Sequence, residues 1–177
     1  MLKTQEMVRE MLQALEVPVR DTPGLDLGVP LERLGNLVEE EADEFCQAMR
    51  LLQVIRNRKE QWRQVVFAEL GEKGGAWDWP RLFSLSDEEL AEEMTLYWWS
   101  EVIDAICDII VVVHNASNIM GIDIEPYFAE VHRTNMAKVG GPIRASDGKR
   151  LKPEGWESPD ILGMLKRELK GGDGEER

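Results

Sequence analysis

The fold is decided by residues 101–115, which read EVIDAICDIIVVVHN. Nearly every side chain from 102 to 113 is apolar, and the β-branched run 109–113 taken alone is typical of a strand. The polar exceptions are spaced three, four and seven positions apart, so they fall on one line of a helix. They are Glu101, Asp104, Asp108 and Asn115. We therefore expect a largely buried helix with an acidic line, the alternative being the solvated strip of an ordinary amphipathic helix.

A second acidic helix is expected from residue 31 to about residue 52. Its apolar side chains share one narrow stripe at about 100° per residue, and they are Leu34, Val38, Phe45, Ala48 and Leu52. Glu41 falls in the middle of that stripe and is therefore aimed at the core. A buried carboxylate needs a partner, because burying its charge alone is costly. The partner is a metal ion, a proton or an arginine such as Arg33.

The other acids of this helix divide between its two sides. Glu44 lies at the edge of the apolar stripe and Glu40 at its border. Glu39 and Asp43 point the other way. Because a run of acids is usually a solvated face, we assign Glu39 and Asp43 to the surface and keep the other two as site candidates.

Two core-facing acidic pairs, Glu41/Glu44 and Glu101/Asp104, are expected to meet across a contact between the two helices. Four facing carboxylates cannot all be ionised without a cation. Mg²⁺, or Mn²⁺ as a substitute, relieves this repulsion with oxygen ligands and water and suits phosphoryl chemistry. A di-iron carboxylate site is excluded, because it needs Glu-x-x-His and neither histidine of the chain has that spacing.

The bulk composition restricts the class of protein. The chain has 177 residues and a formal net charge of −13, which argues against nucleic acid and against an anionic membrane surface as partners. Two cysteines are too few for a disulfide scaffold, and no apolar run is long enough to cross a bilayer. No signal peptide is expected at the start. We therefore expect a cytoplasmic protein with one domain over 1–170 and a flexible tail over 171–177.

The remaining pattern predicts an all-α helical bundle of four to five main helices with a C-terminal loop and hairpin extension. Ser86 and Glu89 form a capping box for the long helix, and Gly121 is placed to end it. The helical pattern also continues past residue 52 through Val66, and Asp147-Gly148 is a hairpin turn signal. The expected helices cover residues 1–15, 31–52, 86–120, 123–138 and 161–169.

Four stretches, in order, resemble the motifs of one group of enzymes. Residues 37–45 resemble its LIxEExxEL helix, and residues 101–104 resemble its ExxD motif. Residues 130–138 are similar to VHRSNMxK, and residues 148–160 look like the ending DGKxxKPxGWxxPD. The start of the chain is similar as well. The group is the all-α NTP pyrophosphohydrolase superfamily, with its MazG-like and phosphoribosyl-ATP-pyrophosphohydrolase-like members.

This resemblance implies a hydrolase that cleaves a nucleoside triphosphate between the α and β phosphates, giving the monophosphate and pyrophosphate. It implies that Mg²⁺ is held by Glu41, Glu44, Glu101 and Asp104. Glu40 and Glu41 are then the catalytic carboxylates, with Glu40 as general base or supporting ligand. The nucleotide and pyrophosphate contacts fall to Asn135, Lys138, Lys149 and Lys152. The resemblance also implies a dimer or tetramer in which the helices of two copies complete one bundle.

Several points stay open at the level of the sequence. Residues 50–93 form an insertion where the family usually has a short connection, and this segment extends the helices, covers the site or builds an oligomer contact. The first interpretation of function is hydrolysis of a dNTP in nucleotide-pool house-cleaning. The second is phosphoribosyl-ATP hydrolysis, and the third is a non-catalytic helical module whose acids pair with arginines of a partner. The preferred base and the roles of Asp108 and Asn115 are also open.

Overall fold

The computed structural model describes residues 3–24, 28 and 30–172, and these residues form seven α-helices and no strand. The predicted all-α class is confirmed. The helices are α1 (Thr4–Ala14), α2 (Leu31–Asn57), α3 (Trp62–Lys73), α4 (Trp79–Ser84), α5 (Asp87–Met120), α6 (Ile124–Met136) and α7 (Ile161–Gly172). The contacts divide the chain into two compact units. Unit 1 comprises 1–28 with 114–177, and unit 2 comprises 29–113. Most of the predicted tail over 171–177 lies outside the described residues.

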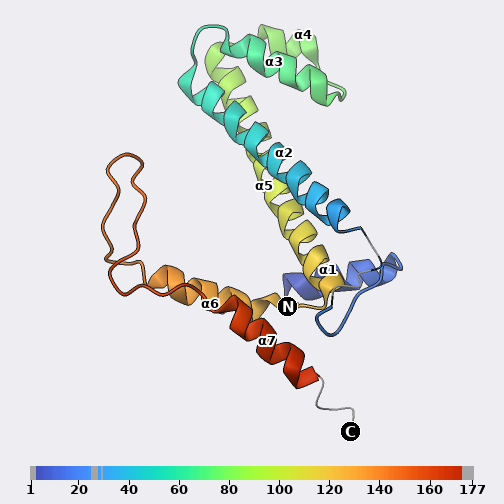
Figure 1. Ribbon diagram of the computed structural model, residues 1–177. Coiled ribbons are helices and arrows are strands. Elements are labelled where there is room, and N and C mark those ends of the chain that lie inside the picture. Colours follow the sequence, from blue (N-terminus) through green and yellow to red (C-terminus); the bar gives the residue numbers. More distant parts are fainter. Residues whose placement is uncertain (1–2, 25–27, 29, 173–177) are drawn as a thin grey trace. The chain divides into compact units, whose positions relative to one another are not determined.

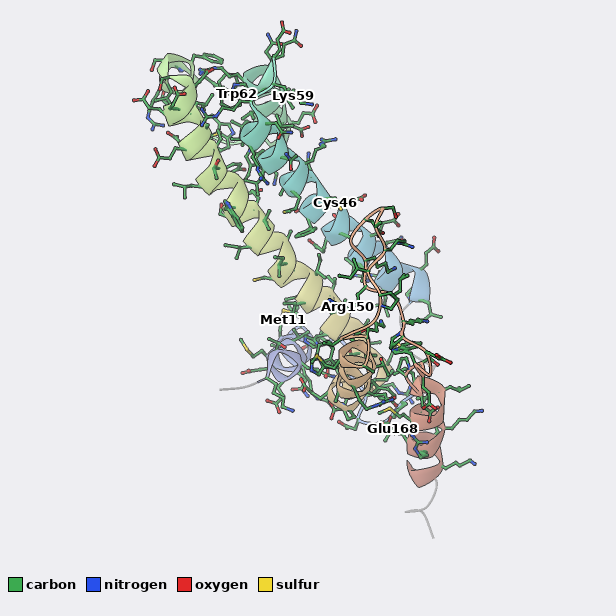
Figure 2. The ribbon with its side chains drawn as sticks, turned by 90° about the vertical axis from the view of Figure 1, so that its left-hand side faces the viewer. Met11, Cys46, Lys59, Trp62, Arg150 and Glu168 are labelled. Carbon is green, nitrogen blue, oxygen red and sulfur yellow. The ribbon has the colours of Figure 1, made fainter. Side chains whose placement is uncertain are left out.

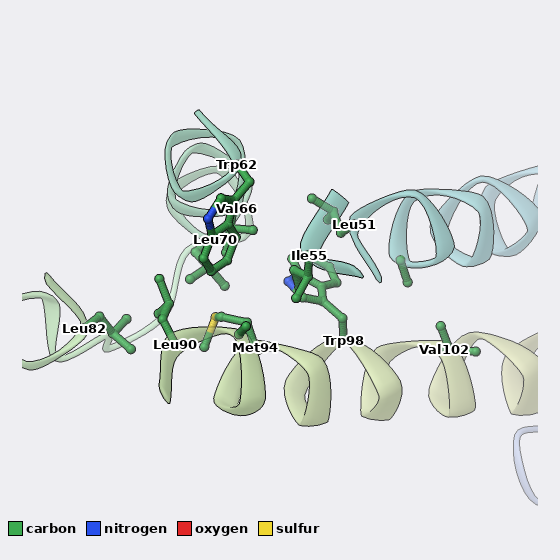
Figure 3. Close-up of a cluster of buried hydrophobic side chains, with 12 residues drawn as sticks. Leu51, Ile55, Trp62, Val66, Leu70, Leu82, Leu90, Met94, Trp98 and Val102 are labelled. Carbon is green, nitrogen blue, oxygen red and sulfur yellow. The ribbon is translucent and has the colours of Figure 1, made fainter. Parts of the chain in front are cut away.

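Unit 2 is built on α2 and α5, which run side by side, with α3 and α4 packed at one end of the pair (Figures 1 and 2). Its core lies at that end, where all four helices contribute buried side chains (Figure 3). The core side chains are Ala48, Leu51, Ile55, Trp62, Val66, Leu70, Leu82, Leu90, Ala91, Met94, Trp98 and Val102. Most of them belong to residues 50–93. The insertion is therefore the main part of this core.

The chain turns between α2 and α3, where the sequence pattern predicts continued helix through Val66. Arg58 ends α2 in the left-handed region at φ 43°, and Gln61 precedes α3 at φ 67°. The reversal brings Trp62 and Val66 back onto the core formed by α2 and α5. Burial of these two large side chains compensates for two non-glycine residues at positive φ.

The ends of α5 follow the predicted local signals. The Ser86 backbone N–H donates to Glu89 Oε2 (2.9 Å), and the Glu89 N–H donates to Ser86 Oγ (3.2 Å), which completes the capping box. The helix ends at Met120, and Gly121 follows at φ 71°. A Cβ on Gly121 would lie 2.1 Å from the Thr22 carbonyl oxygen, so both the backbone conformation and the close approach require glycine.

Unit 1 is held together by polar contacts around the end of α5. The Gln5 amide donates to the Ile122 carbonyl (2.7 Å) and accepts from the Ile124 N–H (3.2 Å). Asp123 caps α6 by accepting from the Glu125 N–H, as the sequence predicts. The loop after α6 contains the predicted hairpin, with an antiparallel bridge between Ile143 and Arg150. No helix in the described part of the chain is long and apolar enough to span a membrane.

Candidate metal and nucleotide site

The acids of α2 lie on a face that is only partly covered. Glu41 is half-buried, while Glu40 and Glu44 are exposed. The pKa of Glu41 is raised above its ordinary 4.5, first by burial and then by the negative charges of Asp108, Glu44, Glu40 and Asp104. Two of these charges belong to α5. Glu41 therefore lies within electrostatic reach of acids on both helices.

The α5 acids differ in exposure and in their effect on Glu41. Asp108 is half-buried and raises the pKa of Glu41 more than exposed Asp104 does. Asp108 is one helical turn beyond Asp104 on the acidic line, so the sequence contained the signal for it but did not decide its role. We add Asp108 to the candidate site.

Glu101 is engaged by a residue that the sequence did not indicate. The Lys73 ammonium forms an ion pair and a hydrogen bond with the Glu101 carboxylate. Lys73 Nζ also lies 5.8 Å from the centroid of the buried Trp98 ring. Burial acts to lower the pKa of Lys73, but the hydrogen bond and the charges of Glu101, Tyr97 and Glu44 outweigh it, so the pKa is raised.

The acidic cluster is more open than expected. The sequence predicts that the two acidic pairs meet in a buried contact, but Glu44 and Asp104 are exposed in the described chain. Two neighbouring helices bury only the stripes that face each other, and α3 and α4 cover only one end of the pair. A further layer is needed to remove these carboxylates from water.

The cluster fits a hard divalent cation by its chemistry, but its side chains are not arranged as a complete ligand set. The donors are carboxylate oxygens, which Mg²⁺ prefers. The negative charges of the neighbouring acids contribute to the raised pKa of Glu41. In the part of the chain that the structure describes, no three Asp, Glu, His or Cys side chains converge closely enough to hold an ion. Glu101 would have to exchange Lys73 for the cation.

Two of the four predicted nucleotide-binding residues lie over one aromatic ring in unit 1, and a third bonds to one of these two. Lys138 Nζ donates to Asn135 Oδ1 (2.7 Å) and lies 5.3 Å from the Trp156 ring centroid. Lys152 Nζ lies 4.0 Å from the same centroid. The Trp156 indole N–H donates to the Thr134 carbonyl (2.8 Å), which fixes the ring against α6. In the sequence Trp156 is only one position of a motif, and the structure makes it the centre of this basic cluster.

Lys149 is placed apart from this group. It lies at the hairpin turn, where its backbone N–H donates to Asp147 Oδ1 (3.1 Å). Its side chain is exposed. None of its described contacts joins it to Trp156.

A family model for phosphoribosyl-ATP pyrophosphohydrolase matches residues 8–135, which is more than half of the chain. The chain belongs to the phosphoribosyl-ATP pyrophosphohydrolase family. This family is part of the MazG-like all-α NTP pyrophosphohydrolase superfamily, so the chain is a hydrolase acting on acid anhydrides. The match includes both acidic helices and ends at Asn135, leaving Lys138, Lys149 and Lys152 outside it. No curated protein matches the chain.

Proposed function

We propose that this member of the phosphoribosyl-ATP pyrophosphohydrolase family uses Mg²⁺ to cleave a nucleotide between its α and β phosphates. The observation that carries the proposal is the grouping of acids from α2 and α5 around Glu41, whose carboxyl pKa is raised by burial and by their charges. Such crowding is stable at neutral pH when a cation shares the site. The substrate is a dNTP, with phosphoribosyl-ATP as a second candidate that the family match favours at least equally. Both candidates present the same α–β phosphoanhydride.

The acidic residues have distinct roles in this mechanism. Glu41, Glu44, Glu101 and Asp104 would hold the cation, and Asp108 supports Glu41. When bound, the cation supplies positive charge that neutralises phosphate oxygens and makes a water more acidic. Glu40 takes the proton from the attacking water. The water oxygen then bonds to the α-phosphorus as the α–β bridging P–O bond breaks, and pyrophosphate leaves. Lys138 and Lys152 contact the nucleotide phosphates, and Asn135 positions Lys138.

The substrate proposal is tested by pyrophosphate release from the full chain with Mg²⁺. The panel contains the four common dNTPs, the four NTPs and phosphoribosyl-ATP. Preference for a dNTP supports the first candidate, and preference for phosphoribosyl-ATP supports the second. Release of orthophosphate in place of pyrophosphate would overturn the proposed bond cleavage.

We also propose that a second copy of the chain covers the open face of α5. An apolar stripe on this helix is exposed at intervals of three and four residues, the spacing of a helix-pairing seam. It consists of Leu96, Trp99, Ile103, Ile106, Ile110 and Val113. At its start the stripe joins a groove of about 840 Å³ lined by Leu52 and Met49 of α2. The exposed parts of the stripe amount to on the order of 600 Å² per copy, approaching the ~800 Å² that each side of a stable interface buries.

The mass of the protein in solution tests this self-association. Sedimentation equilibrium is expected to give a dimer or tetramer for the wild type. Ile103→Glu should shift the protein towards monomer, because it introduces a charge into the centre of the stripe. Leu162→Glu, on the exposed surface of α7, is the matched control and should leave the mass unchanged. A monomeric wild type would overturn this proposal.

A further inference from the structure

The segment between the two acidic helices places a positively charged lysine side chain next to one of the acids proposed as metal ligands. Lys73 is the last residue of α3, and it forms the ion pair with Glu101 described above. The side chains of Lys73 and Glu101 are 30% and 24% exposed, so the pair is partly shielded from water. The arginines with described ion pairs in unit 2 bind other acids, none of which is a proposed metal ligand. These acids are Glu69, Glu88, Asp87 and Glu93.

The position of Lys73 is fixed by the core. Val66 and Leu70 of α3 are fully buried in the core shared with α2 and α5, and the Lys73 ammonium lies over the buried Trp98 ring. Glu101 is three residues beyond Trp98 on α5, almost one turn along the helix. The packing of α3 in this shared core therefore places the ammonium beside this one carboxylate, while a solvated lysine would have many conformations open to it.

We propose that Lys73 is a positioning residue that holds Glu101 in the cation-free protein and releases it when a divalent cation binds. The inference rests on the proposed function, because it takes Glu101 as a cation ligand. Lys73 and the cation compete for the same carboxylate oxygens, and the Lys73 charge also repels the incoming cation. The insertion thus sets the cation affinity of the site, a property that the two acidic helices alone do not determine.

The experiment measures cation binding without substrate. Mg²⁺ and Mn²⁺ are titrated into the full chain by calorimetry, and the shift in melting temperature is recorded in parallel. Lys73→Met keeps an unbranched side chain over Trp98 but removes the charge. A partly shielded ion pair of this kind contributes modestly, so Lys73→Met is expected to bind the cation about two- to fivefold more tightly. Lys73→Arg, which keeps the charge, should restore the wild-type affinity.

Lys59→Met is the matched control. It removes the same charge from the same unit, on the connection between α2 and α3. About 13 residues of α2 separate Glu44 from the end of the helix, so Lys59 lies about 20 Å from Glu44 along the helix axis. The Lys59→Met variant should bind the divalent cation with the affinity of the wild type. If Lys73→Met melts early in EDTA, Lys73→Gln provides a second uncharged variant that can still donate a hydrogen bond to Glu101.

The outcomes separate this inference from the proposed function. Unchanged or weaker cation binding in both uncharged variants would overturn the role of Lys73, even if the wild type releases pyrophosphate normally. Wild-type protein that binds no cation would overturn it as well. If the cation binds as predicted but no substrate in the panel yields pyrophosphate, the role of Lys73 stands and the proposed reaction fails.

Discussion

Glu41→Gln is expected to stabilise the cation-free protein while removing its activity. The pKa of the half-buried Glu41 carboxyl is raised first by burial and then by the negative charges of its neighbours, Asp108, Glu44, Glu40 and Asp104. Glutamine has nearly the same shape and no charge, so the repulsion disappears. The same substitution removes a proposed ligand, so the variant should also lose its stabilisation by Mg²⁺.

The size of the effect follows from the number of neighbours. Each nearby like charge at this exposure costs a few tenths of a kcal/mol, which gives about 1 kcal/mol for the four acids together. For a chain of this length that corresponds to a rise of roughly 2–4 °C in Tm. With the cation at about a hundredfold above its Kd, the wild type gains about 2.7 kcal/mol from binding and becomes the more stable of the two.

The pH dependence has a defined sign. A raised carboxyl pKa means that Glu41 adds stability when it is protonated, below its ordinary 4.5, and that this stability is lost as the pH rises through the folded-state pKa. The advantage of Glu41→Gln over the wild type should therefore be present at pH 7 in EDTA and vanish below pH 4.5.

Thermal melts in EDTA and in Mg²⁺, across this range of pH, provide the assay. Glu39→Gln is the control, because Glu39 is an exposed acid of the same helix and is absent from the charges that act on Glu41. A lower Tm for Glu41→Gln in EDTA would refute the reasoning. It would mean that the carboxylate has a cationic partner in the protein, as in the Arg33 alternative raised by the sequence.

Three other predictions concern the rest of the molecule. Asp104→Asn should reduce pyrophosphate release at least a hundredfold with little change in Tm. Asp43→Asn, on the surface side of α2, is the control and should retain full activity. Equal activity in the two variants would remove Asp104 from the site. Lys138→Met should raise KM more than it lowers kcat, and a change in kcat alone would contradict a role in binding. Burial and the hydrogen bond to Glu168 raise the pKa of Tyr127 to about 12. The stability that Tyr127 contributes is therefore complete below pH 10 and lost as the pH rises through 12. Tyr127→Phe should flatten the pH dependence of the unfolding free energy in that interval, and an unchanged profile would exclude Tyr127 as the cause of that dependence.

Local rules account for the parts of the fold that the sequence predicted correctly. The capping box at Ser86 and Glu89 and the glycine at 121 involve only neighbouring residues, so pattern and structure agree there. The helix predicted over 101–115 is confirmed, because the spacing of its acids is a better guide than the strand preference of β-branched residues.

Other features depend on contacts that periodicity does not contain. The reversal at Arg58 and Gln61 uses positive φ at residues with no preference for it, and it is this reversal that brings Lys73 to Glu101. Periodicity also gives the direction in which Glu44 and Asp104 point along their helices, but it does not say whether anything covers them. The sequence therefore identified candidate acids, and it missed both their exposure and their lysine neighbour.

The core formed by residues 50–93 has a consequence for exchanging this segment with the short connection of other family members. Swapping residues 50–93 for a short linker would delete the side chains on which Trp98 and Met94 rest, so the acidic helices would lose their support along with the insertion. Residues 50–93 and the facing surface of α5 are complementary parts of one core. Chimaeras between long and short members should accordingly fold only when both regions come from the same parent.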